Sequence, residues 1–139
     1  MLIGGDVASD FNIYTYFIER LAYKNNCRNK KMKIVFILGN HELWSFPSKT
    51  IDDITNIYRN IIEKNGMCFI QNELLHVDAD NKIQKISCPE LLQCNETELR
   101  MKLQRSKLVI FGGIGFSGYN DEFNADQGIY RQTITSTHT

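Results

Sequence analysis

Short apolar runs alternate with helical repeats along this chain, and their order predicts an α/β fold. The run Lys33–Leu38 is apolar after its first residue, too short for a buried helix and typical of a strand covered on both faces. Apolar residues at three- and four-residue spacing predict an amphipathic helix from Phe11 to about Asn26, with Ser9 or Asp10 as its N-cap. A second helix is expected after the capping box Thr50–Asp53.

The second half of the chain has a strand-like pattern. Strands are predicted at Met67–Ile70, Leu74–Val77, Lys82–Ser87 and Leu108–Phe111, and residues 78–81 are expected to be a turn rather than a calcium loop. Residues 88–106 have no clean period and are expected to form a short helix or a covering loop. No repeat or linker divides the chain, so one domain over residues 1–139 is predicted.

Composition narrows the class of protein. The 139 residues are 42% hydrophobic, and 16 basic residues balance 16 acidic ones, so charge gives no strong nucleic-acid signal. No apolar stretch is long enough for a membrane span, the N-terminus lacks the features of a signal peptide, and the four cysteines form no Cys-x-x-Cys pair. We therefore expect a cytoplasmic protein with reduced thiols and no membrane partner.

Two polar motifs follow the first two predicted strands. Gly4-Gly5-Asp6 ends the short apolar stretch at the N-terminus, and Gly39-Asn40-His41-Glu42 directly follows Lys33–Leu38. Ligands bind at the carboxyl ends of parallel strands, where both loops would open on the same edge of the sheet. Carboxylate and amide oxygens are hard ligands that suit divalent metal ions when histidines complete the set.

At these residues the sequence resembles the calcineurin-like metallophosphoesterases of the bacterial type. Their signature order is Asp-x-His, Gly-Asp, Gly-Asn-His-Asp/Glu, a lone His and Gly-His-x-His, and this chain matches the second and third blocks. The resemblance implies a partial two-sheet α/β sandwich and a single domain truncated at both ends. The serine/threonine phosphatase branch is disfavoured, because Asp6 is followed by Val7-Ala8-Ser9.

The resemblance also implies a chemistry. A complete domain would hydrolyse phosphomonoesters or phosphodiesters with two divalent metal ions (Mn, Fe, Zn or Mg), acting on a phosphorylated substrate that the sequence does not identify. Asp6 would bridge the metals, Asn40 would bind one of them, and His41 would stabilise developing charge or protonate the leaving oxygen. Glu42 would orient His41 or support the ligands from behind. We expect weak metal binding and little activity from these 139 residues alone, and the oligomeric state is open.

The glycine-rich stretch Gly113–Gly118 fits the Gly-x-Gly-x-x-Gly pattern of dinucleotide sites, but no helical face follows it. A similar stretch in some bacterial calcineurin-like proteins makes three downstream residues candidates on the substrate side: Asn120, Asn124 and Arg131. Two alternative functions remain, a non-catalytic binding module with this fold and a nucleotide-binding α/β domain.

Four other residues with ring side chains are given structural interpretations. His76 is expected to be a strand histidine, and His138 lies in a terminal segment that lacks the Gly-His-x-His pattern. Trp44 and Phe46, just past the second motif, are expected to pack into the core rather than to wall a site.

Overall fold

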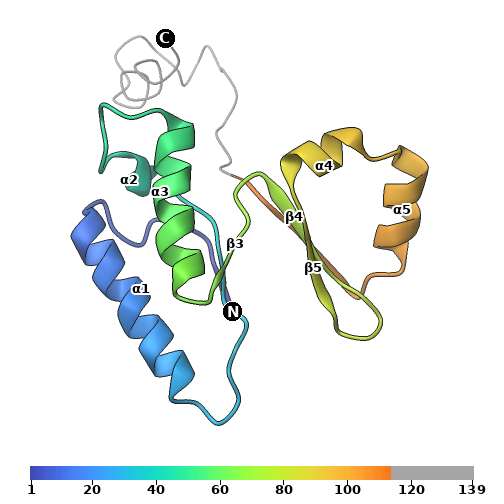
Figure 1. Ribbon diagram of the computed structural model, residues 1–139, viewed down its shortest axis with the longest axis horizontal. Helices are drawn as coiled ribbons and strands as arrows, with labels where there is room; N and C mark the ends of the chain where they lie inside the picture. Colours follow the sequence, from blue (N-terminus) through green and yellow to red (C-terminus); the bar gives the residue numbers. More distant parts are fainter. Residues whose placement is uncertain (114–139) are drawn as a thin grey trace, which may run out of the picture. The chain divides into compact units, whose positions relative to one another are not determined.

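A computed structural model describes residues 1–113 and confirms the α/β class (Figure 1). The described residues form two small sheets and five helices, divided between two compact units, Met1–Phe69 and Ile70–Gly113. This architecture is consistent with a partial calcineurin-like α/β fold. The expectation of one domain over residues 1–139 stays a prediction.

The first unit contains a three-stranded parallel sheet. Its strands are β1 (Leu2–Ile3), β2 (Val35–Phe36) and β3 (Cys68–Phe69), in the spatial order β1-β2-β3. Leu2 pairs with Val35, so the first two predicted strands are parallel neighbours, as the sequence indicated. Strand β2 is shorter than the predicted Lys33–Leu38, because each neighbouring strand pairs with it over only two residues.

Two helices supply most of the core of this unit. Helix α1 (Phe11–Asn26) is capped by Asp10, and α3 (Ile51–Lys64) is capped by Thr50, whose hydroxyl oxygen accepts from Asp53 N–H. Their inner faces pack with the sheet into one cluster, in which each fully buried large apolar side chain stabilises the fold by roughly 1.5–3 kcal/mol. The buried residues of this cluster are Tyr14, Ile18, Ala22, Ile34, Phe36, Leu38, Ile54, Tyr58, Ile62, Met67 and Phe69.

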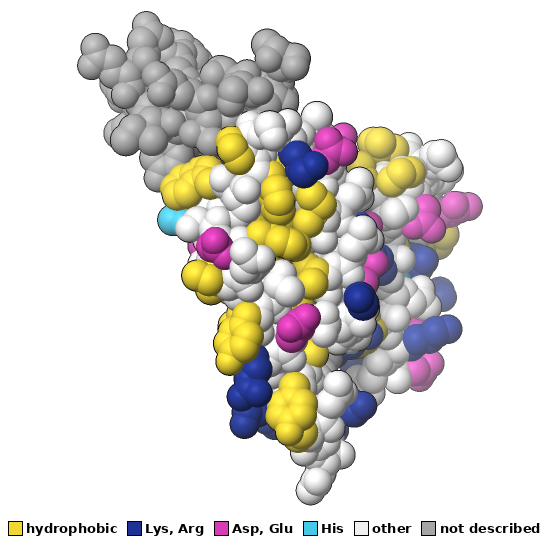
Figure 2. Space-filling model, turned by 60° about the vertical axis from the view of Figure 1, so that its left-hand side comes forward, with side chains coloured by type: hydrophobic (Ala, Val, Ile, Leu, Met, Phe, Trp, Pro, Cys, Tyr) yellow, Lys and Arg dark blue, Asp and Glu magenta, His cyan; other side chains and the backbone are white. Residues whose placement is uncertain are grey.

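The outer face of α1 is also partly apolar. Ile13, Tyr16 and Tyr23 are each more than half exposed, and Figure 2 shows hydrophobic side chains spread along this side of the molecule. The guanidinium of Arg20 lies 5.7 Å from the centre of the Tyr23 ring, a distance typical of a cation–π contact. The inward face of the helix follows the predicted repeat, whereas its outward face is less polar than that of most surface helices.

The second unit is built on an antiparallel sheet. Its strands are β4 (Glu73–Val77), β5 (Ile83–Ile86) and β6 (Leu108–Gly112), in the order β5-β4-β6. The turn between β4 and β5 closes when Asp78 N–H donates to Lys82 O at 3.1 Å, which confirms the predicted hairpin. His76 lies in β4 and is buried, as expected for a strand histidine.

Residues 88–104 form two helices where the sequence predicted one short helix or a covering loop. Helix α4 (Cys88–Gln93) begins with a capping box between Ser87 and Glu90, and α5 (Glu96–Gln104) is capped by Asn95. Neither helix contains a fully buried residue, so no apolar period marks them. The capping box was the signal available in the sequence.

Two negative expectations can be compared with the described residues. No helix in residues 1–113 combines the length and apolar character needed to cross a membrane. All four cysteines lie in this range and are thiols rather than disulfides, as predicted.

Candidate functional site

The loops that follow β1 and β2 press directly against each other. Gly5 has φ 88°, and a Cβ atom there would overlap Gly39 N and lie 2.5 Å from the carbonyl carbon of Leu38. A Cβ atom on Gly39 would overlap Asp6 Oδ1 and lie 2.6 Å from Asp6 Cγ. Glycine is therefore required at both positions for the two backbones to approach this closely.

Glu42 holds the two loops together. Its side chain is fully buried, and its carboxylate accepts four backbone N–H groups. Oε2 accepts from Asp6 at 2.9 Å and from Gly39 at 2.8 Å, whereas Oε1 accepts from Val7 at 2.6 Å and from Ala8 at 3.4 Å. Hydrogen bonds of this kind, from backbone amides to a buried charge, are among the stronger ones in proteins.

Two roles were expected for Glu42, which were to orient the imidazole of His41 or to support the ligands from behind. Within residues 1–113, the hydrogen bonds of its carboxylate go to backbone amides, a pattern that favours the second role. Its carboxylate fixes the backbone of the two loops from which the side chains of Asp6 and Asn40 project. Asp6 itself has φ 55°, an unusual value for a non-glycine residue, and the bond from its N–H to Glu42 helps to hold it there.

The side chains of Asp6 and Asn40 meet at the edge of the sheet, as predicted from the two strand ends. Asp6 Oδ1 accepts from the backbone N–H of His41 at 3.1 Å. The Asn40 amide faces the same carboxylate. With its nitrogen turned toward Asp6, the amide donates at 3.2 Å to Oδ1 and at 3.3 Å to Oδ2.

This pair is chemically suited to a divalent cation. If the amide oxygen of Asn40 were turned toward Asp6, three oxygens would converge, which is unfavourable unless a cation lies among them. Carboxylate and amide oxygens are the donors that hard divalent ions prefer. Within residues 1–113, no group of three or more His, Cys, Asp or Glu side chains is arranged so that it could hold a metal ion.

His41 lies beside this pair on the short helix α2 (Asn40–Leu43), where the sequence predicted a loop. Its imidazole is exposed and packs against Trp44 in a tilted arrangement, with ring centres 4.1 Å apart and planes inclined by 40°. Trp44 is 39% exposed, so the core position predicted for it is wrong. Phe46 does pack against the core, at 5.2 Å from the ring of Phe11.

Tyr58 in α3 contacts the residues around the site, and the sequence analysis did not identify it as a candidate. Its hydroxyl donates to Glu42 O at 3.2 Å and also lies 3.1 Å from the hydroxyl of Ser45, which donates to Ser9 O. Burial raises the pKa of Tyr58, and the bond with Ser45 partly opposes this increase. A tyrosine on a helical face that is otherwise apolar was the available signal.

Several predicted residues fall outside the described range. Asn120, Asn124 and Arg131 lie there, as do His138 and all of the glycine-rich stretch except Gly113. The site that the structure describes therefore consists of Asp6 and Asn40 with His41 beside them and Glu42 behind.

Comparison with known proteins gives one match. A family model described as calcineurin-like phosphoesterase matches residues 1–131, which is most of the chain. Searches of curated proteins and of solved structures each returned no match.

Proposed function

Because the chain belongs to the calcineurin-like phosphoesterase family, we propose that it hydrolyses phosphomonoesters or phosphodiesters with the aid of two divalent metal ions. Membership of the family suggests phosphoester hydrolysis in general. The observation that carries the more specific proposal is the convergence of the Asp6 carboxylate and the Asn40 amide from two strand ends, with a 3.2 Å separation.

Asp6 and Asn40 are the residues that would hold metal, and Mn, Fe, Zn and Mg all fit oxygen donors of this kind. Metal ions of a two-metal site activate water and neutralise charge on a phosphoryl group. Glu42 contributes indirectly, because its four bonds to backbone amides keep both metal-holding residues on one side of the two loops. Such positioning is what allows a site to bind without reorganisation.

His41 is proposed as the catalytic residue. Its imidazole is exposed beside Asp6 and Asn40 and supported by Trp44, so it is able to meet a bound phosphate ester. There it would donate a hydrogen bond to the developing charge or a proton to the leaving oxygen. Asn120, Asn124 and Arg131 remain proposed contacts on the substrate side.

We also propose a cellular location and a partner for the protein. We place it in the cytoplasm, and the four thiols support a reducing compartment. Its partner would be a small phosphorylated substrate of open identity.

The test compares metal content and hydrolysis in the whole protein to which these residues belong. His41→Ala should leave metal content nearly intact and lower kcat by on the order of 10²–10³-fold, because a group that acts only as charge develops adds little to metal binding. Asp6→Asn should lower both quantities. Asp52→Asn, at an exposed position in the first turn of α3, makes the same chemical change and should alter neither.

Elemental analysis gives the metal content, and chromogenic phosphate monoesters and diesters give the rates. If His41→Ala loses metal as completely as Asp6→Asn, the role assigned to His41 is wrong. If the metal-loaded protein hydrolyses neither class of ester, the result contradicts the enzyme proposal and favours a binding module with the same fold.

A further inference from the structure

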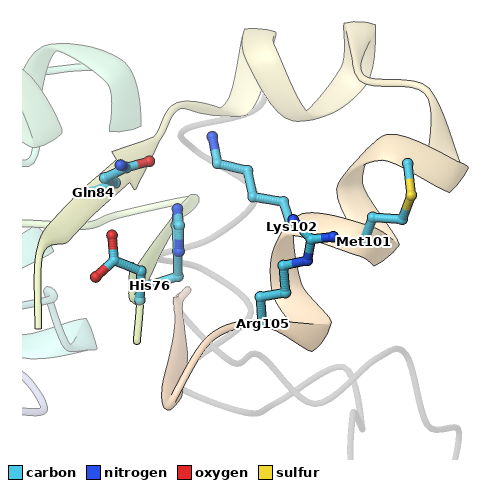
Figure 3. A pocket seen from close by; sticks show the side chains of 6 residues that line it. His76, Gln84, Met101, Lys102 and Arg105 are labelled. Atoms are coloured by element: carbon cyan, nitrogen blue, oxygen red, sulfur yellow. The ribbon is translucent and has the colours of Figure 1, made fainter. Parts of the chain in front are cut away.

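A pocket lined by residues of the Ile70–Gly113 unit has no part in the proposed hydrolysis. It has a volume of about 500 Å³, within the usual range for small-molecule sites. It lies between the sheet and α5 (Figure 3). Its lining residues are His76, Asp78, Gln84, Met101, Lys102 and Arg105.

The sheet provides the floor of this pocket. His76 in β4 is opposite Gln84 in β5, and residues directly opposite each other in an antiparallel pair project from the same face. His76 is only 2% exposed. Its ring nitrogen Nε2 is buried and has no hydrogen-bond partner among the described residues. A buried polar atom without a partner is unfavourable unless water or a ligand satisfies it.

The other ring nitrogen of His76, Nδ1, has a partner in Ser106. Nδ1 lies 3.0 Å from Ser106 Oγ, which itself lies 3.1 Å from Lys102 O. If the Ser106 hydroxyl donates to Lys102 O, Nδ1 donates to Ser106, and Nε2 is an acceptor in the neutral ring or a second donor in the imidazolium ion. If the hydroxyl donates to Nδ1 instead, Nε2 carries the proton of the neutral ring and is a donor.

Two cationic side chains, Lys102 and Arg105, line the same pocket as His76. Figure 3 shows the His76 ring directed into a space bordered by Gln84 on one side and by Lys102 and Arg105 on the other. Among the described residues that line the pocket, Asp78 is the carboxylate, and its Oδ1 accepts from Asp80 N–H and Lys82 N–H at 2.9 and 2.8 Å. The pocket therefore has two cationic groups, one carboxylate engaged in its own turn, and a buried imidazole.

We propose that this pocket binds a small molecule through an oxyanion group, a phosphate or a carboxylate, held by His76 Nε2, Lys102 and Arg105. The guanidinium of Arg105 matches the geometry of either oxyanion, and the Lys102 ammonium adds a second charge. Gln84 offers both an amide donor and an amide acceptor to the rest of the ligand, and Met101 forms an apolar wall. The site is distinct from Asp6 and Asn40, and its ligand need not be the substrate.

The experiment follows the ring nitrogens of His76 by NMR while anions are added to the full chain. Inorganic phosphate and malonate are the two probes, chloride at the same ionic strength is the control, and a chelator excludes metal ions so that the outcome is independent of the proposed phosphoesterase site. His76→Gln assigns the signal. We expect phosphate, malonate or both to shift Nε2 saturably, and chloride to cause no saturable shift.

Variants of exposed cationic residues test whether the anion binds in this pocket. Arg105→Gln and Lys102→Met should each weaken binding by about two- to fivefold, the scale of a solvent-exposed charge contact. Arg100→Gln removes a cation of the same helix that instead pairs with Glu96 at 3.1 Å, and it should have no measurable effect.

A saturable response to phosphate alone assigns a phosphate ligand, and one to malonate alone assigns a carboxylate, so either supports the proposal. A response that does not saturate, that chloride reproduces, or that survives both Arg105→Gln and Lys102→Met overturns it. So does an Nε2 signal that responds to neither probe, which would indicate that buried water satisfies this atom.

Discussion

Replacing Glu42 with glutamine should destabilise the first unit strongly, although the two side chains have nearly the same shape. The buried carboxylate accepts four backbone N–H groups, and an amide has only one oxygen with which to accept them. Whichever way the amide turns, its NH₂ group faces two backbone donors and cannot bond to either. The variant Glu42→Gln thus removes two hydrogen bonds and adds a clash between donors.

The structure indicates which pair is lost. The bonds to Asp6 and Gly39 are 2.9 and 2.8 Å, whereas those to Val7 and Ala8 are 2.6 and 3.4 Å. The second pair contains one long bond, so the amide nitrogen should face Val7 and Ala8. A hydrogen bond to a charged group contributes about 1.5–3 kcal/mol, and the smaller desolvation cost of a neutral amide offsets part of the loss. We expect a net loss of about 3 kcal/mol of unfolding free energy.

Urea unfolding followed by circular dichroism measures this loss. With a slope of about 2 kcal/mol per molar urea, 3 kcal/mol corresponds to a decrease of about 1.5 M in the midpoint. The control is Glu19→Gln, the same chemical change at an exposed position of α1, which should shift the free energy by less than about 0.5 kcal/mol. If Glu42→Gln is as stable as the control, the cost of burying the charge cancels its hydrogen bonds, and the role assigned to Glu42 is refuted.

Three further outcomes are expected. Gly39→Ala places a methyl group against Asp6 and should weaken metal binding by at least about tenfold in calorimetry. Gly4→Ala is the control and should leave the metal affinity unchanged, because its methyl group would meet nothing within 4 Å. Equal affinities for the two variants would contradict the close approach of Gly39 to Asp6. Tyr58→Phe removes the bond to the backbone of α2 and should lower the free energy of unfolding by about 1–2 kcal/mol in urea, and an unchanged value would show that this bond contributes nothing. Burial raises the pKa of Tyr14 and of Tyr58 above 10.0, so the folded state holds these phenol protons more tightly than the unfolded state does. The free energy of unfolding should therefore keep its full value below pH 10 and decrease progressively as the pH rises above 10. An ultraviolet titration in which all tyrosines ionise normally in the folded protein would show this reasoning to be wrong.

The strands and the site loops were predictable because local pattern determines them. Lys33–Leu38 has no polar side chain after Lys33, so burial on both faces follows directly, and the motif that starts at Gly39 must lie at a strand end. The pairing of Leu2 with Val35 then brings Asp6 near Asn40, as expected from the parallel arrangement. The apolar run predicted that a strand is present but not how long it is, because the length of β2 depends on its pairing with β1 and β3.

The partners of Glu42 were not predictable from local pattern. Three of its four bonds reach residues 34 to 36 positions away, and nothing within Gly39–Glu42 indicates which distant amides will lie nearby. The same applies to His76, whose Nδ1 lies 3.0 Å from the hydroxyl oxygen of Ser106, 30 positions away. Hydrogen bonds between segments that are far apart in the sequence cannot be predicted from the residues next to either partner.

The most direct test of the proposed metal-holding role is a crystal structure with Mn²⁺, using the anomalous signal of manganese to locate the ion. We expect an anomalous peak at bonding distance from an Asp6 carboxylate oxygen and from the Asn40 amide oxygen, with the amide nitrogen turned away from Asp6. An ion bound elsewhere, or an Asn40 nitrogen that still donates to Asp6 when manganese is bound, would contradict the proposal that these two residues hold the metal.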